Sequence, residues 1–294
     1  MSITISGESE FVQANGLRHH LLTYGDPGAQ PLLILPGITS PAATADFLAI
    51  RIADLGFRPI VPDIRGRGQT EVPPAGSYTL DHYAADIAGL VGALGLSRPV
   101  IIGHSMGARI AAAYVTTYQP QDHDVVVLVD PPISGPERGP YPTSLASFMS
   151  QLNEAREGTT LSAVRRFYPK WPERELQIRI DVLPSCDETA VRETHAGFES
   201  EDFFPYWRRL TMPARTSSST AARGARSRTC PSGAGPRRAT TSRAARASVV
   251  SRAVSLSTIS RSRGPGVARP SHTQAPSCSR RLPAATSDWT TTAA

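Results

Sequence analysis

Residues 99–109 read PVIIGHSMGAR, and this stretch decides the fold. Its apolar run leads into the pattern Gly-x-Ser-x-Gly, centred on Ser105, and then into a helix-like segment over residues 108–118. A serine between glycines, in a sharp turn from a strand to a helix, presents its hydroxyl at the end of the strand. The pattern predicts Ser105 as the nucleophile of an acyl transfer to water. The alternative is an incidental serine in a strand–helix turn.

Short apolar runs alternate with helix-like segments on both sides of this turn. Such alternation predicts an α/β fold with a mostly parallel sheet, covered by helices on both faces. We expect this core to span residues 1–133. Strands are expected at residues 17–24, 32–35, 59–61, 100–102 and 125–129, the last of them buried, and helices at residues 44–55, 80–94 and 108–118.

From residue 134 the alternation stops, and helical patterns rich in aromatic residues follow. We expect residues 134–210 to form a helical cap over the active site. Extra helices packed elsewhere on the core are the alternative.

The composition changes again at residue 211. From Arg215 to the end there are 14 arginines and one acidic residue, Asp288, so this segment accounts for the net charge of +6. Such a segment has too few apolar residues to form a core, and we expect residues 211–294 to be disordered. A basic tail that binds nucleic acid or lipid and a simple linker are two interpretations. We favour a third, a frameshifted reading of a GC-rich gene, because the last strands that the sheet requires are missing from the sequence.

Composition also narrows the class of protein. The three cysteines lie far apart and form no C-x-x-C pair, which favours a reducing compartment. The sequence shows no signal peptide, no apolar run of the roughly 20 residues that a membrane span needs, and no phosphate loop, dinucleotide fingerprint or metal-ligand cluster. We therefore expect a cytoplasmic protein without cofactor or metal that binds neither nucleic acid nor membrane. The oligomeric state is not predicted.

Two backbone N–H groups are candidates for an oxyanion hole. Met106 follows the serine at the start of a helix, where N–H groups and the helix dipole favour negative charge. The N–H of Ile38 lies in the loop after the predicted strand 32–35, where Gly37 permits a close turn. A purely structural turn is the alternative for this loop.

The acid of a catalytic triad has one good candidate. Asp130 ends the predicted strand 125–129, so it should lie beside Ser105 at the carboxyl edge of the sheet. A cap before Pro131 is the alternative role for this aspartate. Many hydrolases place the acid one strand later, but this sequence contains no acid there.

The base is missing from the pattern. The order Ser…Asp…His requires a late histidine, and only His272 lies late enough, although its flanks predict no strand-to-helix loop. His195 falls in the predicted cap, and the His104 side chain should point away from the Ser105 hydroxyl. The other histidines lie in an early strand, at a helix start and in a loop: His19, His20, His82 and His123.

Arginines near the carboxyl edge of the sheet could bind a substrate carboxylate. We select Arg65 and Arg109 as candidate substrate-binding residues, with Arg67 close by. The alternative is that these side chains brace loops.

Four segments together resemble the α/β-hydrolase family over roughly residues 10–214, and within it the hydrolases of small dicarboxylic formamides in nicotinate degradation. They are PGITSP at residues 36–41, DIRGRG at 63–68, GHSMGAR at 103–109 and VDPPISGP at 129–136. The resemblance implies cofactor-free, serine-dependent hydrolysis of a small dicarboxylic amide, with Asp130 as the acid.

The same resemblance implies a histidine in a late Gly-His loop, which this sequence lacks. We therefore expect the chain as written to be inactive, because a serine without a base is a weak nucleophile. Other functions compatible with the sequence are a carboxylesterase, an enol-lactone hydrolase, and a non-catalytic hydrolase-like module with a basic binding tail.

Overall fold

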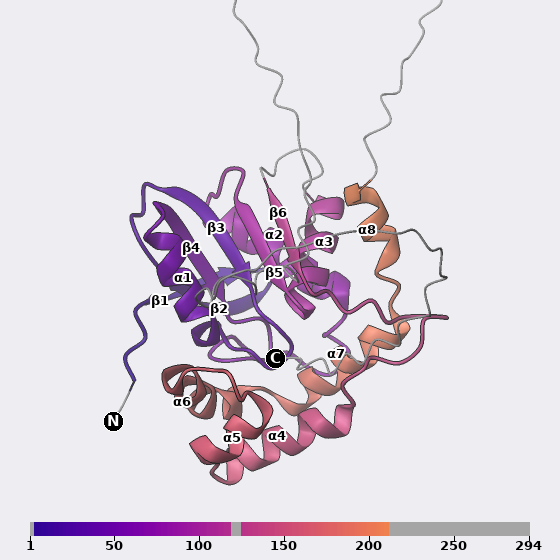
Figure 1. The fold of residues 1–294 in the computed structure, drawn as a ribbon. Helices are drawn as coiled ribbons and strands as arrows, with labels where there is room; N and C mark the ends of the chain where they lie inside the picture. The colour runs from indigo at the N-terminus through magenta and orange to yellow at the C-terminus, as the bar shows by residue number, and fades with distance from the viewer. Residues whose placement is uncertain (1–2, 119–124, 212–294) are drawn as a thin grey trace, which may run out of the picture.

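The computed structural model describes residues 3–118 and 125–211, and it shows a six-stranded sheet between layers of helices (Figure 1). The predicted α/β fold is confirmed. The sheet is mixed, because its first two strands run antiparallel to their neighbours while the other four are parallel. In the order β1-β2-β4-β3-β5-β6, the strands are β1 (Glu8–Ala14), β2 (Leu17–Thr23), β4 (Phe57–Pro62), β3 (Gln30–Leu35), β5 (Val100–His104) and β6 (Val126–Val129).

Alternating side chains of the strands divide the core between the two faces of the sheet. Leu32 and Ile34 pack with the short helices η1 (Ala42–Ala45) and α1 (Asp46–Ala53) on one face. Leu33 and Leu35 join the larger cluster with α2 (Leu80–Ala93) and α3 (Met106–Tyr118) on the other face. This period of two is what a strand buried on both faces requires. The first ten residues of α3 are buried, and its alanines permit close packing against β5 and α2.

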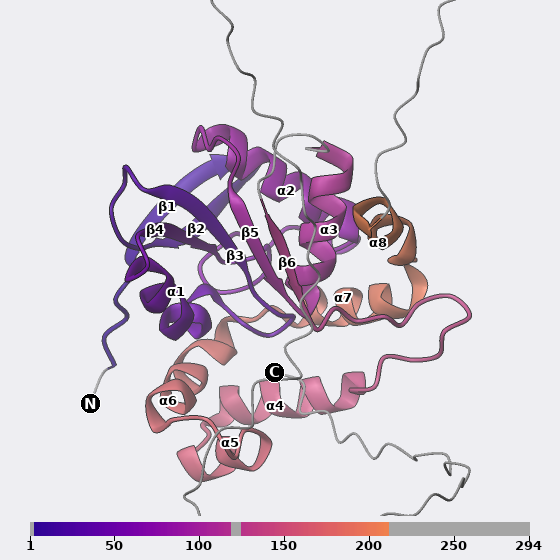
Figure 2. The same ribbon diagram turned by 45° about the horizontal axis from the view of Figure 1, so that its top comes forward.

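Helices follow one another from Leu145 to Thr211, after a segment without helix or strand at residues 134–144, but not all of these helices cover the same part of the core. The first four α-helices lie beyond the carboxyl ends of β5 and β6, whereas the last, α8, lies beside α3 (Figures 1 and 2). The elements are α4 (Leu145–Glu157), α5 (Leu161–Phe167), α6 (Glu173–Val182), η2 (Leu183–Ser185), α7 (Glu188–Ser200) and α8 (Phe204–Thr211).

The boundary between core and cap stays a prediction. Side chains of α4 and α7, such as Phe148 and Val191, belong to the same buried cluster as Leu35 of β3. The proposed division into residues 1–133 and 134–210 therefore crosses a continuous hydrophobic core. A smaller cluster between α5 and α6, built on Tyr168 and Leu176, lies apart from it.

Two strands differ from the expectations of the sequence. β1 was not predicted, because most of its residues are exposed and its sequence, ESEFVQA, has little apolar alternation. β6 was expected to be a buried strand, but all four of its residues are half-buried. Within the described residues β6 pairs only with β5, so it is the edge of the sheet in that part of the chain.

The prediction for residues 211–294 falls outside the described residues, apart from Thr211 at the end of α8. In the described ranges, no helix is long and apolar enough to cross a bilayer.

Candidate active site

The turn between β5 and α3 has the geometry that its glycines require. Ser105 has a φ of +52°, a left-handed conformation that is strained for a residue with a side chain. A Cβ on Gly107 would lie 1.9 Å from the carbonyl oxygen of Leu35, and one on Gly103 would lie 2.3 Å from the carbonyl oxygen of Gly107. Only glycine fits at either position. The backbone therefore holds Ser105 at the carboxyl end of β5, where 4% of its surface is exposed.

Strand register places Asp130 next to this serine. β5 and β6 are parallel, His104 is the partner of Val129, and the N–H of Ser105 donates to the carbonyl of Val129 at 2.9 Å. Ser105 and Asp130 thus directly follow paired residues at the ends of the two neighbouring strands. Asp130 is exposed and also has a left-handed backbone, with a φ of +47°. The predicted proximity of the two residues follows from this register, while the role of Asp130 stays a prediction.

The candidate oxyanion donors flank the turn. Met106 is the first residue of α3, where N–H groups have no acceptor within the helix. Ile38 is fully buried in the loop after β3. The close approach of Gly107 to Leu35 and Pro36 brings that loop against the elbow. The arrangement fits an oxyanion hole made of the Ile38 and Met106 N–H groups, which stays a prediction.

Tyr141 is a neighbour of Ser105 that the sequence did not reveal. Burial raises the pKa of its phenol, the charge of Asp130 acts in the same direction, and the Ser105 side chain acts in the opposite direction. Tyr141 is therefore a neutral hydrogen-bonding group at neutral pH. Its ring packs against Phe198 with centroids 4.9 Å apart and against His195 at 5.8 Å. The segment around it carries no motif, so no sequence signal pointed to this contact.

His19 and His20 lie in β2, three strands away from β5 in the sheet order. At a strand spacing of about 4.8 Å this is roughly 14 Å, too far for a base of Ser105. The His20 imidazole instead bonds Asp63 at 2.6 Å through Nδ1 and the Ser9 hydroxyl at 2.9 Å through Nε2. These contacts fasten the loop after β4 to β2.

Other described histidines also have partners of their own. His82 lies at the start of α2, with Nδ1 2.8 Å from Thr79 Oγ1, and His195 has Nε2 2.9 Å from the carbonyl oxygen of Thr143. Burial lowers the pKa of His104, an effect that the charge of nearby Asp130 opposes.

Among the described residues, no histidine is hydrogen-bonded to Ser105. The candidates His123 and His272 lie outside the described ranges.

The arginines chosen from the sequence have protein partners. Arg65 is buried and donates from Nε and Nη2 to the carboxylate of Asp86, at 2.6 and 2.5 Å, and from Nη1 to the carbonyl of Ser77. Arg109 is also buried and donates to the carbonyls of Phe198 and Glu201, at 3.2 and 2.7 Å. Burial lowers the pKa of Arg109 to about 10. These contacts favour the alternative that both arginines brace loops.

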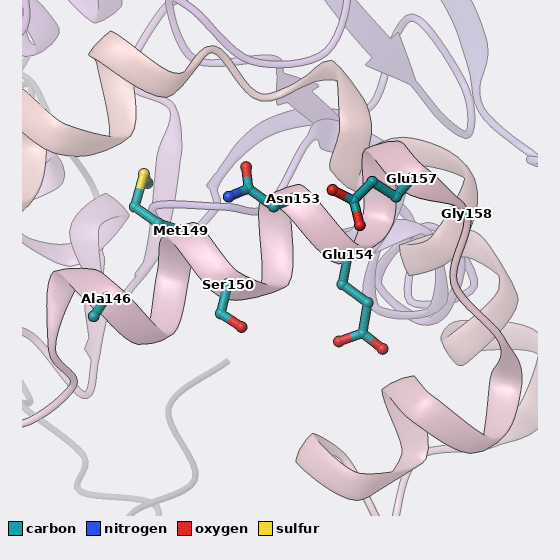
Figure 3. Close-up of a pocket in the computed structure, with 7 residues that line it drawn as sticks. All are labelled: Ala146, Met149, Ser150, Asn153, Glu154, Glu157 and Gly158. Carbon is teal, nitrogen blue, oxygen red and sulfur yellow. The ribbon is translucent and has the colours of Figure 1, made fainter.

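A hollow on the surface does not coincide with this site. It lies along α4, has a volume of about 530 Å³ and is shown in Figure 3. Neither Ser105 nor Asp130 lines it, and its polar residues, such as Asn153 and Glu157, come from one helix. The residues that line this hollow form no catalytic arrangement. In the described part of the chain, no group of three or more His, Cys, Asp or Glu residues is placed to hold a metal ion.

Comparison with known proteins agrees with this geometry. A family model described as alpha/beta hydrolase fold matches residues 30–214. The chain is 38% identical over 214 residues to N-formylmaleamate deformylase of Pseudomonas putida strain KT2440, covering 73% of this chain and 78% of that protein. It is 30% identical over 202 residues to 2-(acetamidomethylene)succinate hydrolase of Mesorhizobium japonicum, covering 65% of this chain and 71% of that protein.

Solved structures point to the same proteins. The crystal structure of an N-formylmaleamic acid deformylase from Pseudomonas putida S16 is 37% identical, with a TM-score of 0.64 over 70% of this chain and 79% of that chain. The structure of E-2-(acetamidomethylene)succinate hydrolase is 27% identical, with a TM-score of 0.56 over 70% of this chain and 78% of that chain.

Proposed function

The chain belongs to the α/β-hydrolase fold family, and we propose that it is a serine amidohydrolase that converts N-formylmaleamate to maleamate and formate. The observation that carries the reaction class is Ser105, held in a left-handed turn beside Asp130. The choice of substrate rests on the likeness to relatives whose names describe an N-formyl and an acetamido derivative of a dicarboxylic acid.

The proposed reaction has two steps. The hydroxyl oxygen of Ser105 attacks the formyl carbon, and the N–H groups of Ile38 and Met106 receive the negative charge on the carbonyl oxygen. The C–N bond then breaks, and maleamate leaves with a proton on its nitrogen. Water attacks the formyl ester of Ser105, which releases formate and restores the serine hydroxyl.

Both steps need a group that takes and returns a proton, which is the role of histidine in a triad. Asp130 is the residue that we propose to orient such a base. Tyr141 does not replace it, because a half-buried phenol with a raised pKa keeps its proton at neutral pH. Since no described histidine is hydrogen-bonded to Ser105, we expect this chain to hydrolyse its substrate very slowly without an added base.

A panel of substrates tests the proposed activity. The full-length protein is incubated with N-formylmaleamate, p-nitrophenyl acetate and an enol-lactone, with and without imidazole as an external base, and formate and the two other products are measured. We expect formate release, accelerated by imidazole, to exceed ester and lactone hydrolysis. Faster hydrolysis of the ester or the lactone would replace the proposed substrate by the corresponding alternative.

A further inference from the structure

His20 connects a serine and an aspartate at the opposite end of the sheet from the candidate active site. Its Nε2 lies 2.9 Å from the hydroxyl oxygen of Ser9, and its Nδ1 lies 2.6 Å from a carboxylate oxygen of Asp63. Ser9 belongs to β1, which is four strands away from β5 and Ser105 in the sheet order. The three side chains form the series of serine, imidazole and carboxylate contacts that activates a nucleophilic serine.

The contacts on the two ring nitrogens of His20 determine where its proton lies. A carboxylate only accepts hydrogen bonds, so Nδ1 carries the proton and donates it to Asp63. Nε2 then has a free lone pair, which accepts from the Ser9 hydroxyl and, at 3.3 Å, from the side-chain amide nitrogen of Gln69. In this tautomer the imidazole is able to take the proton of Ser9.

Asp63 is fixed in the position that an acid partner needs. It is buried, and its carboxylate accepts from the N–H of Ala42 at 2.6 Å and from the N–H of Gln69 at 2.9 Å. A Cβ on Gly68 would lie 2.0 Å from the same carboxylate, so only glycine lets the loop approach it this closely. The carboxylate therefore stays beside His20 and compensates the positive charge that the imidazole gains with a second proton.

Burial divides the three residues into a shielded base and an accessible nucleophile. His20 has 3% of its surface exposed, whereas Ser9 is an exposed residue. Phe11 lies two residues further along the same face of β1, is 39% exposed, and has its ring centre 5.1 Å from that of His20. Ser9 is thus accessible from solvent and has an aromatic surface beside it.

We propose that Ser9 is a second nucleophile, activated by His20 and Asp63, that accepts an acyl group from aryl esters. The Ser9 oxygen forms a bond to the acyl carbon, and the hydroxyl proton passes to Nε2 of His20. The bond between the acyl carbon and the phenolic oxygen breaks, and the phenolate leaves with the electron pair. His20 returns to its neutral form by releasing the proton to water.

The class of acyl donor follows from what these three residues supply. A phenolate leaves without a proton, so a base next to the nucleophile is enough, whereas the nitrogen of an amide has to be protonated as it leaves. The exposed ring of Phe11 favours an aromatic leaving group. Acylation of Ser9 is therefore separate from the amide hydrolysis proposed for Ser105 and does not depend on it.

Acetylation by p-nitrophenyl acetate tests the proposal in full-length Ser105→Ala protein, in which the candidate active site lacks its nucleophile. Tandem mass spectrometry of peptides measures how fast each serine gains an acetyl group. Ser97 and Ser150 are matched controls, because both are exposed and neither is hydrogen-bonded to a described histidine. We expect Ser9 to be acetylated about 100-fold faster than either control, the lower end of what general base catalysis contributes.

Two further samples separate the arrangement from the local sequence. Denaturation in urea removes the contacts among the three residues, so there Ser9 should react no faster than Ser97. His20→Asn, in the same Ser105→Ala background, should also remove the preference for Ser9, with circular dichroism to check that this variant folds. Because the comparison in urea needs no further substitution, the test stands even if His20→Asn does not fold.

Equal acetylation of Ser9, Ser97 and Ser150 in the folded protein would overturn the proposal. A preference for Ser9 that persists in urea would overturn it too, because the local sequence would then be its cause. Acetyl found on His20 in place of Ser9 would show that the imidazole is itself the nucleophile and would equally contradict the proposal. The function proposed for Ser105 is judged separately, by formate release from N-formylmaleamate.

Discussion

At the scale of single residues, the ends of β5 and β6 are both strained. Ser105 and Asp130 have left-handed backbones at neighbouring strand ends, with φ values of +52° and +47°. Each such conformation costs of order 1–3 kcal/mol for a residue other than glycine and persists only where the surrounding structure enforces it. At Ser105 the enforcing contact is the approach of Gly107 to the carbonyl of Leu35.

Substitution of Gly107 by alanine tests that contact. The added Cβ would lie 1.9 Å from the Leu35 carbonyl oxygen, so α3 must move away from β3. We expect Gly107→Ala to lower the free energy of unfolding by about 3 kcal/mol or more, measured by urea denaturation. Gly92→Ala is the matched control, because Gly92 lies exposed in α2 with nothing within 4 Å of an added Cβ.

The control should be stabilised, by up to about 1 kcal/mol, since alanine is the better helix former. If both variants unfold like the unmodified protein, the elbow is not held by close packing, and our explanation of the strained serine is wrong.

Residues whose partners are close in sequence could be predicted, and those with remote partners could not. The turn around Ser105 is determined by glycines two residues away, so the motif alone located it. Tyr141 and Arg179 contact Ser105 and Thr39, respectively, across long stretches of chain, and nothing local marks them. Arg65 was selected as a substrate-binding residue because it lies in a motif, but its N–H groups donate to Asp86 and Ser77.

At the scale of elements, the predicted strands and helices of the core agree with the structure because their apolar patterns match their burial. The strand predicted at residues 32–35 is β3, and its four apolar side chains are buried on alternating faces. β1 lacked such a signal, since an edge strand with mostly exposed residues needs few apolar side chains. The packing direction of the helices after residue 134 could not be predicted, because it depends on remote contacts such as those of Arg67.

Arg67 connects the core to α7 and provides a test at this scale. It donates to the Ala190 carbonyl and the Thr194 hydroxyl of α7, and its removal leaves buried acceptors without a donor. We expect Arg67→Met to increase amide hydrogen exchange throughout Glu188–Ser200 and to lower the free energy of unfolding by about 3 kcal/mol. Mass spectrometry after deuterium labelling resolves the α7 peptides.

Arg192→Gln is the control, because this solvent-exposed ion pair between Arg192 and Glu188 on α7 contributes little to stability. Exchange in α7 that is the same in Arg67→Met and the unmodified protein would show that another contact holds the helix.

At the scale of the whole molecule, two histidines shielded from solvent, the buried His19 and the half-buried His104, make stability depend on pH. Burial lowers the pKa of His19 and His104 below the ordinary value of 6.5. The unfolded chain takes up protons near pH 6.5 while the folded protein does not, so the free energy of unfolding falls as pH drops from 7.5 to 5.5. The slope is at most about 1.4 kcal/mol per pH unit for each histidine.

Urea denaturation of the protein and of His104→Asn at both pH values checks this dependence. Burial raises the pKa of Glu201, which contributes with the opposite sign, so the comparison between the two proteins isolates the histidine. The variant should lose less stability than the unmodified protein on going to pH 5.5. An identical loss in both would show that His104 titrates normally in the folded protein.

The central claim is that Ser105 is the nucleophile of an amide hydrolase. Its most direct test is the rate of formate release from N-formylmaleamate in imidazole buffer, compared between the full-length protein and Ser105→Ala. The account predicts formate release by the unmodified protein that rises with imidazole concentration and is lost in Ser105→Ala. Equal formate release by the two proteins at every imidazole concentration would contradict it.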